Sequence, residues 1–493
     1  MVHLVYTSIS ASVLLLSVSV PISAAPQATS QNGQMATLVR RRQGLHTDEE
    51  WGKWAKNQRD YLLAKYDQGN PYEKRSSGTN LITNQNADSS YFGSLAIGTP
   101  PKPYYVILDT GSADLWVAGD RCDQGCESVE RYKSTESSTF KNGTTSFKIQ
   151  YGSGAAVGSL GTDIVQMAGF AVKNQVFAVC NEVSENLLTN PVSGLMGLAF
   201  RAIASSKAMP FWQTLVMSGA WDQPLMAFHL TRFVDAQNIQ NEEPGGSFSM
   251  GFTNSSLYTG DIDYVDLATP QGSYWLASIH HISVNGNIIN FPASRTSYAA
   301  IDTGTTLIGG PSAIIDQIFA QIPGSTPGKG DMETYYTYPC NTTVNITMSF
   351  GGKQSWSISP SDFQLTRLSK NQCLGAFFKL DSQGSAPSWI VGDTFLKNVY
   401  SVFRYSPPSI GFARLSDFAL AENGSNSPTP TPTLGPVTTV SASIMPDRGG
   451  SKHSSNGSHT IKHHHRELLS QATVIAVPIF VLSAMSFLTN FLL

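Results

Sequence analysis

The sequence predicts an all-β protein with two lobes, and three observations support this fold class. The chain has 493 residues, more than a single hydrophobic core usually serves. It contains 42 Gly and 26 Pro, a usage that suits short strands joined by tight turns. It also carries one short aspartate motif in each half of the chain. We therefore expect two similar β-rich lobes.

The low charge of the chain excludes some classes of protein. Charged residues make up 14%, well below the average of about 25%. Such a composition argues against a disordered chain and against nucleic-acid binding. The charge is also uneven, because residues 26–75 hold nine Lys or Arg and six Asp or Glu, whereas residues 76–425 hold 19 and 27. A basic leader therefore precedes an acidic body.

Residues 1–24 have the layout of a secretory signal peptide. The apolar run 9–22 is too short to span a bilayer and is followed by small residues. The preceding residues lack Lys and Arg, and a buried N-terminal helix is the alternative. Secretion is the favoured prediction.

Residues 25–75 form a predicted prosegment. Thr47 and Glu50 make a capping-box pattern that starts a helix reaching about Lys65. Its apolar residues fall near one face and its basic residues elsewhere, so the helix can dock on the acidic body as an intramolecular inhibitor. The dibasic pair Lys74 and Arg75 predicts a processing site that places the mature start near Ser76. The basic run 40–42 is a competing site, and a solvated charge run is the alternative for either.

The body divides into a predicted N-terminal lobe, residues 76–235, and a C-terminal lobe, residues 236–420. Residues 421–458 are rich in Ser, Thr and Pro, which predicts an extended stalk that buries no core. Residues 459–493 end in an uncharged apolar run after a polar spacer, the layout of a GPI-attachment signal with Asn456 as attachment residue. An ordinary transmembrane anchor is the alternative. We expect the protein at the cell surface, bound to the membrane through this anchor.

If the protein is secreted, its cysteines can form disulfides and its sequons can be glycosylated. Five cysteines in an oxidising compartment predict two local disulfides, Cys122 with Cys126 and Cys340 with Cys373. Cys180 lies in an apolar run and is expected to be a buried free thiol. The predicted N-glycosylation sites are Asn142, Asn254, Asn341, Asn345, Asn423 and Asn456.

The strongest functional signal is the repeated motif. An apolar run leads into Asp109-Thr110-Gly111-Ser112 in the first half and into 302–305, Asp-Thr-Gly-Thr, in the second. A tight turn after a buried strand aims a carboxylate into a cleft, where neighbouring N–H and O–H groups can donate to it. Gly197 follows the first aspartate by 88 residues and Gly392 follows the second by 90, each after two apolar residues. Two lobes that each offer one aspartate are the natural inference.

These motifs resemble those of the pepsin-like aspartic proteases, in particular the fungal secreted and surface-anchored members. The resemblance covers most of residues 76–418 and includes YFGSLAIGTPP, IQYGSG, SGLMGLAF, AAIDTGTTLIGGP and WIVGDTFL in order. It implies a bilobal fold with a central cleft closed by a β-hairpin flap. It also implies an aspartic endopeptidase that acts on proteins and peptides at acidic pH.

The resemblance also implies roles for individual residues. Asp109 and Asp302 match the catalytic pair, and Tyr151 matches the flap tyrosine with Trp116 as its hydrogen-bonding neighbour. The supporting residues are Thr110, Ser112, Thr303 and Thr305, and the candidate substrate-binding residues are Gly111, Gly152, Ser153, Gly304, Ile107 and Leu195. Because the flap carries Ser153 where relatives that accept lysine tend to have Asp, cleavage between bulky apolar residues is expected.

The paired carboxylates make chemical sense without the resemblance. Two carboxylates held close together cannot both ionise easily, so the pair can act as acid and base at once on a shared water. This chemistry requires no metal and no cofactor, and we expect a monomer. The alternatives are an inactive pepsin-like binding protein and a cell-wall display glycoprotein, because a fold can be retained when its catalytic activity is lost.

Overall fold

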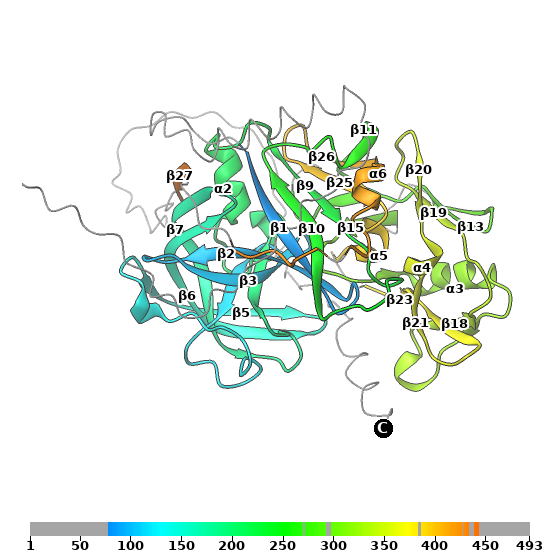
Figure 1. Cartoon of the computed structure of the whole chain (residues 1–493), viewed down its shortest axis with the longest axis horizontal. Helices are drawn as coiled ribbons and strands as arrows, with labels where there is room; N and C mark the ends of the chain where they lie inside the picture. The colour runs from blue at the N-terminus through cyan, green and yellow to red at the C-terminus, as the bar shows by residue number, and fades with distance from the viewer. Residues whose placement is uncertain are drawn as a thin grey trace, which may run out of the picture. The chain divides into compact units, whose positions relative to one another are not determined.

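The computed structural model describes residues 77–269, 272–291, 297–382, 386–425, 427–432 and 438–442. The predicted signal peptide, the prosegment with Lys74 and Arg75, and the GPI signal with Asn456 lie outside these residues. Within the described part, strands dominate and the helices are short, as Figure 1 shows. This confirms the predicted all-β class.

The strands of the N-terminal lobe belong to one large sheet. A hairpin of two long strands, β5 and β6, lies at one edge of this sheet, and β3, β8 and β4 lie inside it. The strands of this lobe are β1 (Gly78–Gln85), β2 (Ser90–Ile97), β3 (Lys102–Asp109), β4 (Leu115–Ala118), β5 (Lys141–Tyr151), β6 (Gly154–Met167), β7 (Phe170–Val183) and β8 (Val192–Gly197).

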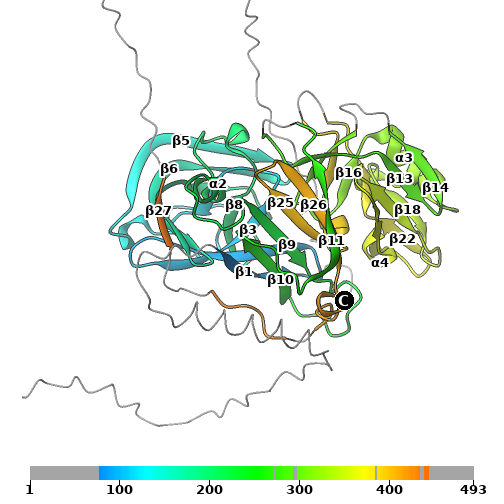
Figure 2. The same cartoon turned by 90° about the horizontal axis from the view of Figure 1, so that it is seen from above.

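The same sheet continues into the second half of the chain. Strand β1 pairs with β2 on one side and with β10 on the other, so that the sheet has 14 strands in the described residues. Its further strands are β9 (Leu225–Leu230), β10 (Glu242–Met250), β11 (Tyr258–Asp266), β25 (Tyr400–Arg404), β26 (Ser409–Leu415) and β27 (Thr438–Ser441). Figure 2 shows β9, β10, β25 and β26 side by side between the two lobes. The lobes therefore share a backbone hydrogen-bonded platform.

Three smaller sheets build the rest of the C-terminal lobe. The first contains β12 (Leu276–Ser278), β15 (Tyr298–Ile301), β16 (Ile308–Gly310), β23 (Phe377–Lys379) and β24 (Trp389–Val391). The second contains β13 (His281–Val284), β14 (Asn287–Asn290), β19 (Ile346–Ser349) and β20 (Ser355–Ile358). The third contains β17 (Thr326–Pro327), β18 (Tyr336–Pro339), β21 (Gln364–Arg367) and β22 (Gln372–Gly375).

The helices are short connectors between these strands. The α-helices are α2 (Phe211–Met217), α3 (Ser312–Ala320), α4 (Pro360–Phe363), α5 (Asp393–Leu396) and α6 (Asp417–Leu420). The 3-10 helices are η1 (Ser134–Glu136), η2 (Arg201–Ile203) and η4 (Gly330–Met332).

The repeat inferred from the sequence is a repeat of strand topology. In the N-terminal lobe, β3 runs parallel to β8, β8 antiparallel to β4, and β4 parallel to β7. In the C-terminal lobe, β15 runs parallel to β24, β24 antiparallel to β16, and β16 parallel to β23. The two aspartate motifs follow β3 and β15, the equivalent strands. The similar spacing of the glycines in the two halves therefore reflects one strand arrangement used twice.

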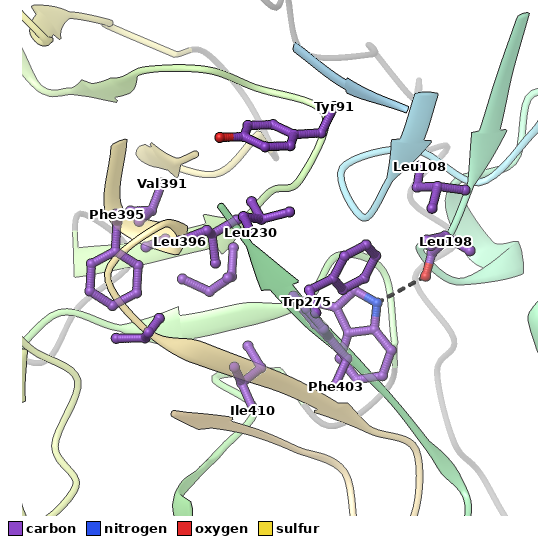
Figure 3. Packing of buried hydrophobic residues seen from close by; sticks show 14 of the residues in the cluster. Tyr91, Leu108, Leu198, Leu230, Trp275, Val391, Phe395, Leu396, Phe403 and Ile410 are labelled. Carbon is purple, nitrogen blue, oxygen red and sulfur yellow. Dashed lines mark hydrogen bonds between the residues drawn. The ribbon is translucent and has the colours of Figure 1, made fainter. Parts of the chain in front are cut away.

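A continuous apolar core lies beneath this arrangement and crosses between the lobes. The indole N–H of Trp275 donates a hydrogen bond to the Leu198 carbonyl at 2.9 Å, which joins the two halves of the chain (Figure 3). Both residues are at most 1% exposed. The labelled residues around them come from both halves: Tyr91, Leu108, Leu230, Val391, Phe395, Leu396, Phe403 and Ile410. Burial of this apolar surface holds the ends of β3 and β24 in place.

The cysteine predictions are confirmed. Cys122 is paired with Cys126 and Cys340 with Cys373, whereas Cys180 is a buried free thiol. Burial raises the pKa of the Cys180 thiol, so it is a poor nucleophile. The five described sequon asparagines, Asn142, Asn254, Asn341, Asn345 and Asn423, are all exposed or half-buried. Their glycosylation stays a prediction.

The C-terminal tail differs from the expected stalk. Residues 438–441 were expected in an extended segment, but they form β27 against β7 of the N-terminal lobe. The sequence Thr-Thr-Val-Ser is rich in β-branched residues, and these favour a strand wherever a free sheet edge accepts them. No helix in the described residues is long and apolar enough to cross a membrane.

A buried histidine on β9 should make the protein less stable in acid. His229 is 1% exposed, and burial lowers its pKa from 6.5 to about 4, although a hydrogen bond with the Ala419 backbone acts in the opposite direction. Its Nδ1 lies 3.6 Å from the Glu422 carboxylate. Between pH 6.5 and pH 4 the unfolded chain therefore takes up a proton that the folded chain does not, so stability falls as the pH falls.

Replacing His229 with Gln should remove this part of the pH dependence. We expect the loss of unfolding free energy between pH 7 and pH 4 to be smaller by about 3 kcal/mol in the variant. Denaturant unfolding at a series of pH values measures it, with the exposed His280→Gln as the matched control. Equal pH slopes in wild type and His229→Gln would contradict the prediction.

Candidate active site

Two aspartates lie at the ends of equivalent strands. Asp109 is the last residue of β3, and Asp302 directly follows β15. Both strands end in buried apolar residues that fix the backbone on the core side. The two aspartates are 0% and 2% exposed. The fold thus holds two carboxyl groups in a buried position without an ion pair from Lys or Arg among the described residues.

Each carboxyl group accepts the same set of hydrogen bonds. The Gly111 N–H donates to Oδ1 of Asp109 at 2.7 Å, and the Ser112 hydroxyl donates to Oδ2. In the second lobe, the N–H of Gly304 donates to Oδ1 of Asp302 at 2.9 Å, and the Thr305 hydroxyl donates to Oδ2 at 2.8 Å. The predicted supporting hydroxyls therefore lie where the sequence places them, beside the two carboxylates.

Two threonines tie the aspartate loops to each other. The Thr110 hydroxyl donates to the Ile301 carbonyl at 2.8 Å and accepts the Thr303 N–H at 2.9 Å. In return, the Thr303 hydroxyl donates to the Leu108 carbonyl at 2.6 Å and accepts the Thr110 N–H at 3.1 Å. These four buried hydrogen bonds cross from lobe to lobe. They fix the separation of the loops and hence of the carboxylates.

The two glycines of the motifs allow the loops to approach closely. A Cβ atom added at Gly111 would lie 2.5 Å from Cγ of Asp302, and one added at Gly304 would lie 2.4 Å from Oδ1 of Asp109. No real side chain tolerates such distances. Each glycine therefore faces the aspartate of the other lobe, which places the two carboxyl groups against the same small space.

Burial and a neighbouring negative charge perturb the first aspartate of this pair. Burial, followed by the negative charge of Asp302, raises the pKa of Asp109 well above its ordinary value of 3.8. The hydrogen bonds from Ser112 and Gly111 act in the opposite direction but do not cancel the rise. The pair consequently retains a proton at pH values where an ordinary aspartate is ionised.

The hairpin of β5 and β6 forms the predicted flap. Tyr151 ends β5 and pairs with Gly154 across a loop made of Gly152 and Ser153. The indole N–H of Trp116 donates to the Tyr151 hydroxyl oxygen at 2.9 Å, as the resemblance implied. Burial and then the charge of Asp109 raise the pKa of Tyr151, so this hydroxyl stays protonated.

A cavity lies beneath the flap. Of the predicted substrate-binding residues, Ile107, Ser153, Leu195 and Gly304 line it, whereas Gly111 lies against Asp302 and Gly152 belongs to the flap loop. Both lobes contribute to the wall, whose other residues are Ser89, Ser90, Tyr91, Tyr151, Leu187, Thr303, Thr305, Thr306 and Asp393. Residues 303–305 line the cavity, so it lies beside the loop that carries the second aspartate.

The family model described as "Eukaryotic aspartyl protease" matches residues 90–415, which is well over half of the chain. The chain belongs to this family. It is an aspartic-type endopeptidase with the two-lobed fold that the repeated motif indicated. The match begins with β2 and ends with β26, so it contains both aspartate loops and the flap.

Several characterised aspartyl proteases are similar to this one over most of their length. Major aspartyl peptidase 1 of Cryptococcus neoformans var. grubii is 44% identical over 353 residues, which cover 70% of this chain and 72% of the relative. Pepsin A of Rhinolophus ferrumequinum is 32% identical, with 66% of this chain and 81% of the relative covered. Cathepsin D of Homo sapiens is 31% identical, with 71% and 86% covered.

Sequence reasoning missed one acidic residue of this aspartyl protease. Asp393 begins α5, is 2% exposed and lines the cavity. Burial raises its pKa well above the ordinary value; the positive charge of Lys397 lowers it, and the negative charge of Asp302 raises it further. A signal was present, because the repeat reads Leu-Met-Gly-Leu at residues 195–198 but Ile-Val-Gly-Asp at residues 390–393. The substitution of a carboxylate for a leucine at equivalent positions marks the asymmetry between the lobes.

Sequence reasoning also missed a buried ion cluster next to the site. The Lys397 ammonium lies 2.9 Å from Asp88 and 2.8 Å from Asp362. Asp362 also pairs with the guanidinium of Arg232. Burial raises the pKa of Asp362, but the charges of Lys397 and Arg232 lower it overall. The cluster joins four segments that are well separated in the sequence.

Proposed function

We propose that this aspartyl protease is a secreted, surface-anchored endopeptidase that works at acidic pH, with Asp109 and Asp302 as its catalytic pair. One observation carries the proposal. The two carboxyl groups accept matching hydrogen bonds, face each other across Gly111 and Gly304, and are held at a fixed separation by reciprocal threonine bonds. Such an arrangement suits a shared water molecule placed between two acids.

The proposed mechanism uses this pair as acid and base. The ionised carboxylate removes a proton from the water, whose oxygen attacks the carbonyl carbon of the peptide bond. The protonated carboxyl group meanwhile donates a hydrogen bond to the carbonyl oxygen and stabilises the negative charge that develops there. The leaving nitrogen then takes up the proton that the first carboxylate removed from the water, the C–N bond breaks and the carbonyl group of the new carboxyl product forms. The raised pKa of Asp109 supports the sharing of one proton by the pair in weak acid.

We further propose a preference for bulky apolar residues on either side of the cleaved bond. The cavity wall presents Ile107, Leu187 and Leu195, and the flap contributes the uncharged Ser153. Asp393 is the one acidic residue among the described residues of this wall, and burial raises its pKa, which favours the neutral form that cannot form an ion pair with a substrate lysine. A series of peptides that differ only in the residue beside the cleaved bond, which is Phe, Leu or Lys, tests the preference. Efficient cleavage of the Lys peptide would contradict it.

The function itself is tested by hydrolysis of denatured globin between pH 3 and pH 6. The purified body is assayed with and without a statine-type transition-state mimic, which binds tightly only to a functional pair. Cleavage that the mimic inhibits supports the proposal. Binding of peptide without cleavage would instead indicate an inactive binding protein. If the protein neither binds nor cleaves peptide, a role as a display glycoprotein would be favoured.

The flap tyrosine should contribute less than the aspartates. Tyr151→Phe removes the hydroxyl that accepts a hydrogen bond from Trp116, so the flap should lose one of the hydrogen bonds that position it. We expect kcat/KM to fall about tenfold, which corresponds to about 1.4 kcal/mol. Steady-state kinetics measure it, with Tyr258→Phe on the distant strand β11 as the control. An unchanged rate would assign Tyr151 to the scaffold alone.

We also propose that residues 25–75 inhibit the precursor and are removed after Lys74 and Arg75. The basic prosegment and the acidic body support this. N-terminal sequencing of the secreted protein locates the cut, and a Lys74→Ala/Arg75→Ala precursor should be inactive near pH 7 and gain activity at pH 4. Full activity of the uncleaved precursor at neutral pH would argue against inhibition.

The C-terminal sequence supports a GPI anchor attached at Asn456. We expect a phosphatidylinositol-specific phospholipase to release the protein from membranes, and we expect the peptide 472–493 to be absent from the mature form. Mass spectrometry of the released and retained fractions measures both. Retention together with an intact C-terminal peptide would favour a transmembrane anchor.

A further inference from the structure

The tail that follows the protease body stays in contact with it. After α6, the Asn423 side-chain oxygen accepts a hydrogen bond from the Arg232 N–H at 2.8 Å. The Gly424 N–H donates to the Arg232 carbonyl at 2.9 Å. Arg232 follows β9 of the shared sheet, so the tail starts from the platform between the lobes rather than from a free end.

Further along, the tail reaches the N-terminal lobe. Pro432 lines a groove together with Tyr104 and Tyr105 of β3, and with Pro191 just before β8. The other residues of this groove are Pro103, Glu127, Ser128, Val129, Glu130 and Asn190. Alternating prolines at positions 428, 430 and 432 suit such a surface, because proline-rich chains are already extended and pack well on aromatic rings.

The tail then adds a strand to the N-terminal lobe. β27 runs parallel to the first residues of β7, with Thr438 opposite Phe170 and Ser441 opposite Lys173. The pairing is closed at both ends, because the Thr438 N–H donates to the Gly169 carbonyl at 2.9 Å and the Ala442 N–H donates to the Lys173 carbonyl at 3.0 Å. Figure 1 shows β27 next to β7 and α2, and Figure 2 shows it next to α2 from a second direction.

The side chains of β27 alternate as those of a genuine sheet strand do. Val440 and Ala442 are half-buried and pack against the main hydrophobic core, whereas Thr439 and Ser441 point to solvent. On the same edge of β7, strand β4 covers only Ala178–Cys180. β27 therefore satisfies backbone groups that β4 leaves open, and it protects a sheet edge.

We propose that residues 427–432 and 438–442 belong to an intramolecular tether, in which the first stretch lies at the tyrosine–proline groove and the second binds the β7 edge. The tether connects the end of the C-terminal lobe to the N-terminal lobe, in addition to the chain that links the lobes directly. Its occupant is this segment of the same chain, held by strand addition and by the apolar side chains of Val440 and Ala442. An extended partner strand from another protein is excluded from this edge while the tether is docked.

Docking also shortens the link to the cell surface, a consequence that rests on the proposed anchor at Asn456. An extended chain spans at most about 3.5 Å per residue. From residue 443 to the anchor it could therefore reach about 50 Å, compared with about 125 Å if the chain were free from residue 421. The body would be held close to the surface, with its N-terminal lobe nearest to the attachment point.

Hydrogen exchange of the full-length secreted protein tests the docking whether or not the anchor exists. In wild type, we expect the amides of Thr438 and Ala442 to exchange at least about 100-fold more slowly than in an unstructured peptide. Val440→Asp places a charge against the core and should abolish this protection, whereas Thr439→Asp places the same charge in solvent and should preserve it. Within residues 170–173 of β7, the amides that face β27 should lose protection only in Val440→Asp, whereas those that face β6 should keep it.

Two outcomes would overturn the proposal. Unprotected amides at 438 and 442 in wild type would show that the strand does not form in solution. Equal exchange in the two aspartate variants would show that Val440 does not dock. Activity on a peptide substrate reports that the body of each variant is folded, and Val440→Ala, with an expected partial loss of protection, replaces Val440→Asp if that variant fails to fold.

Discussion

Replacing Asp109 or Asp302 with asparagine should abolish peptide hydrolysis. In the proposed mechanism the two residues act as one unit, because a single carboxyl group cannot both activate the water and donate a hydrogen bond to the carbonyl oxygen. We expect kcat/KM to fall on the order of 10⁴-fold or more in either variant, and the double variant should be little worse than each single one. Hydrolysis of a chromogenic peptide at pH 4 measures the effect.

The same substitutions should leave the fold nearly intact. An asparagine at either position retains an oxygen that can accept the N–H of Gly111 or Gly304, and the threonine bonds between the loops are untouched. Thermal unfolding and the circular-dichroism spectrum of each variant separate loss of chemistry from loss of structure. Asp331→Asn, at an exposed carboxylate in η4, is the matched control. Activity within tenfold of wild type in Asp109→Asn or Asp302→Asn would contradict the assignment of the pair.

Replacing Lys397 with methionine should strongly destabilise the protein. Lys397, Asp88 and Asp362 are each at most 5% exposed, and the ammonium is the shared partner of both carboxylates. Its removal leaves two buried negative charges with fewer compensating groups, which typically costs about 3–5 kcal/mol. Denaturant unfolding near pH 5 measures the loss. Burial raises the pKa of Asp362, but the positive charges of Lys397 and Arg232 lower it more, so that the pKa lies below 3.8. This carboxylate is therefore still ionised at pH 5.

A second lysine provides the matched control. Lys102 also lies between two carboxylates, at 2.6 Å from Glu130 and 3.4 Å from Glu136, but all three side chains are a third exposed or more. Exposed pairs contribute little, so Lys102→Met should change the free energy of unfolding by less than about 1 kcal/mol. Similar losses in the two variants would show that burial is not what makes the Lys397 cluster important.

The pH dependence of the cluster follows from the same shifts. A carboxylate whose pKa is lowered on folding adds stability above its unfolded pKa, and that stability is lost as the pH falls through the lowered value. For Asp362 this window lies below pH 3.8. The cluster is therefore retained in weak acid, where the protease is proposed to work, while His229 already opposes folding there.

The sequence determined much of the catalytic site by itself. The motifs at 109–112 and 302–305 are local, since each aspartate accepts from groups two and three residues later in its own loop. A tight turn after a buried strand allows few other arrangements. The disulfide between Cys122 and Cys126 is also short-range, because it closes a loop of four positions. The flap hairpin was expected from the family resemblance instead.

Only the tertiary structure decided the features that depend on distant partners. Lys397 and Asp88 are 309 positions apart, and nothing in the residues around either one shows that they meet. Asp393 became part of the site because β24 returns beside β15, and β27 became a strand because β7 presents an open edge. Ion pairing and strand addition depend on which residues the fold brings together from distant parts of the sequence. A local pattern of residue types therefore specifies the aspartate loops, whereas the charge cluster and the docked tail exist only once the chain has folded.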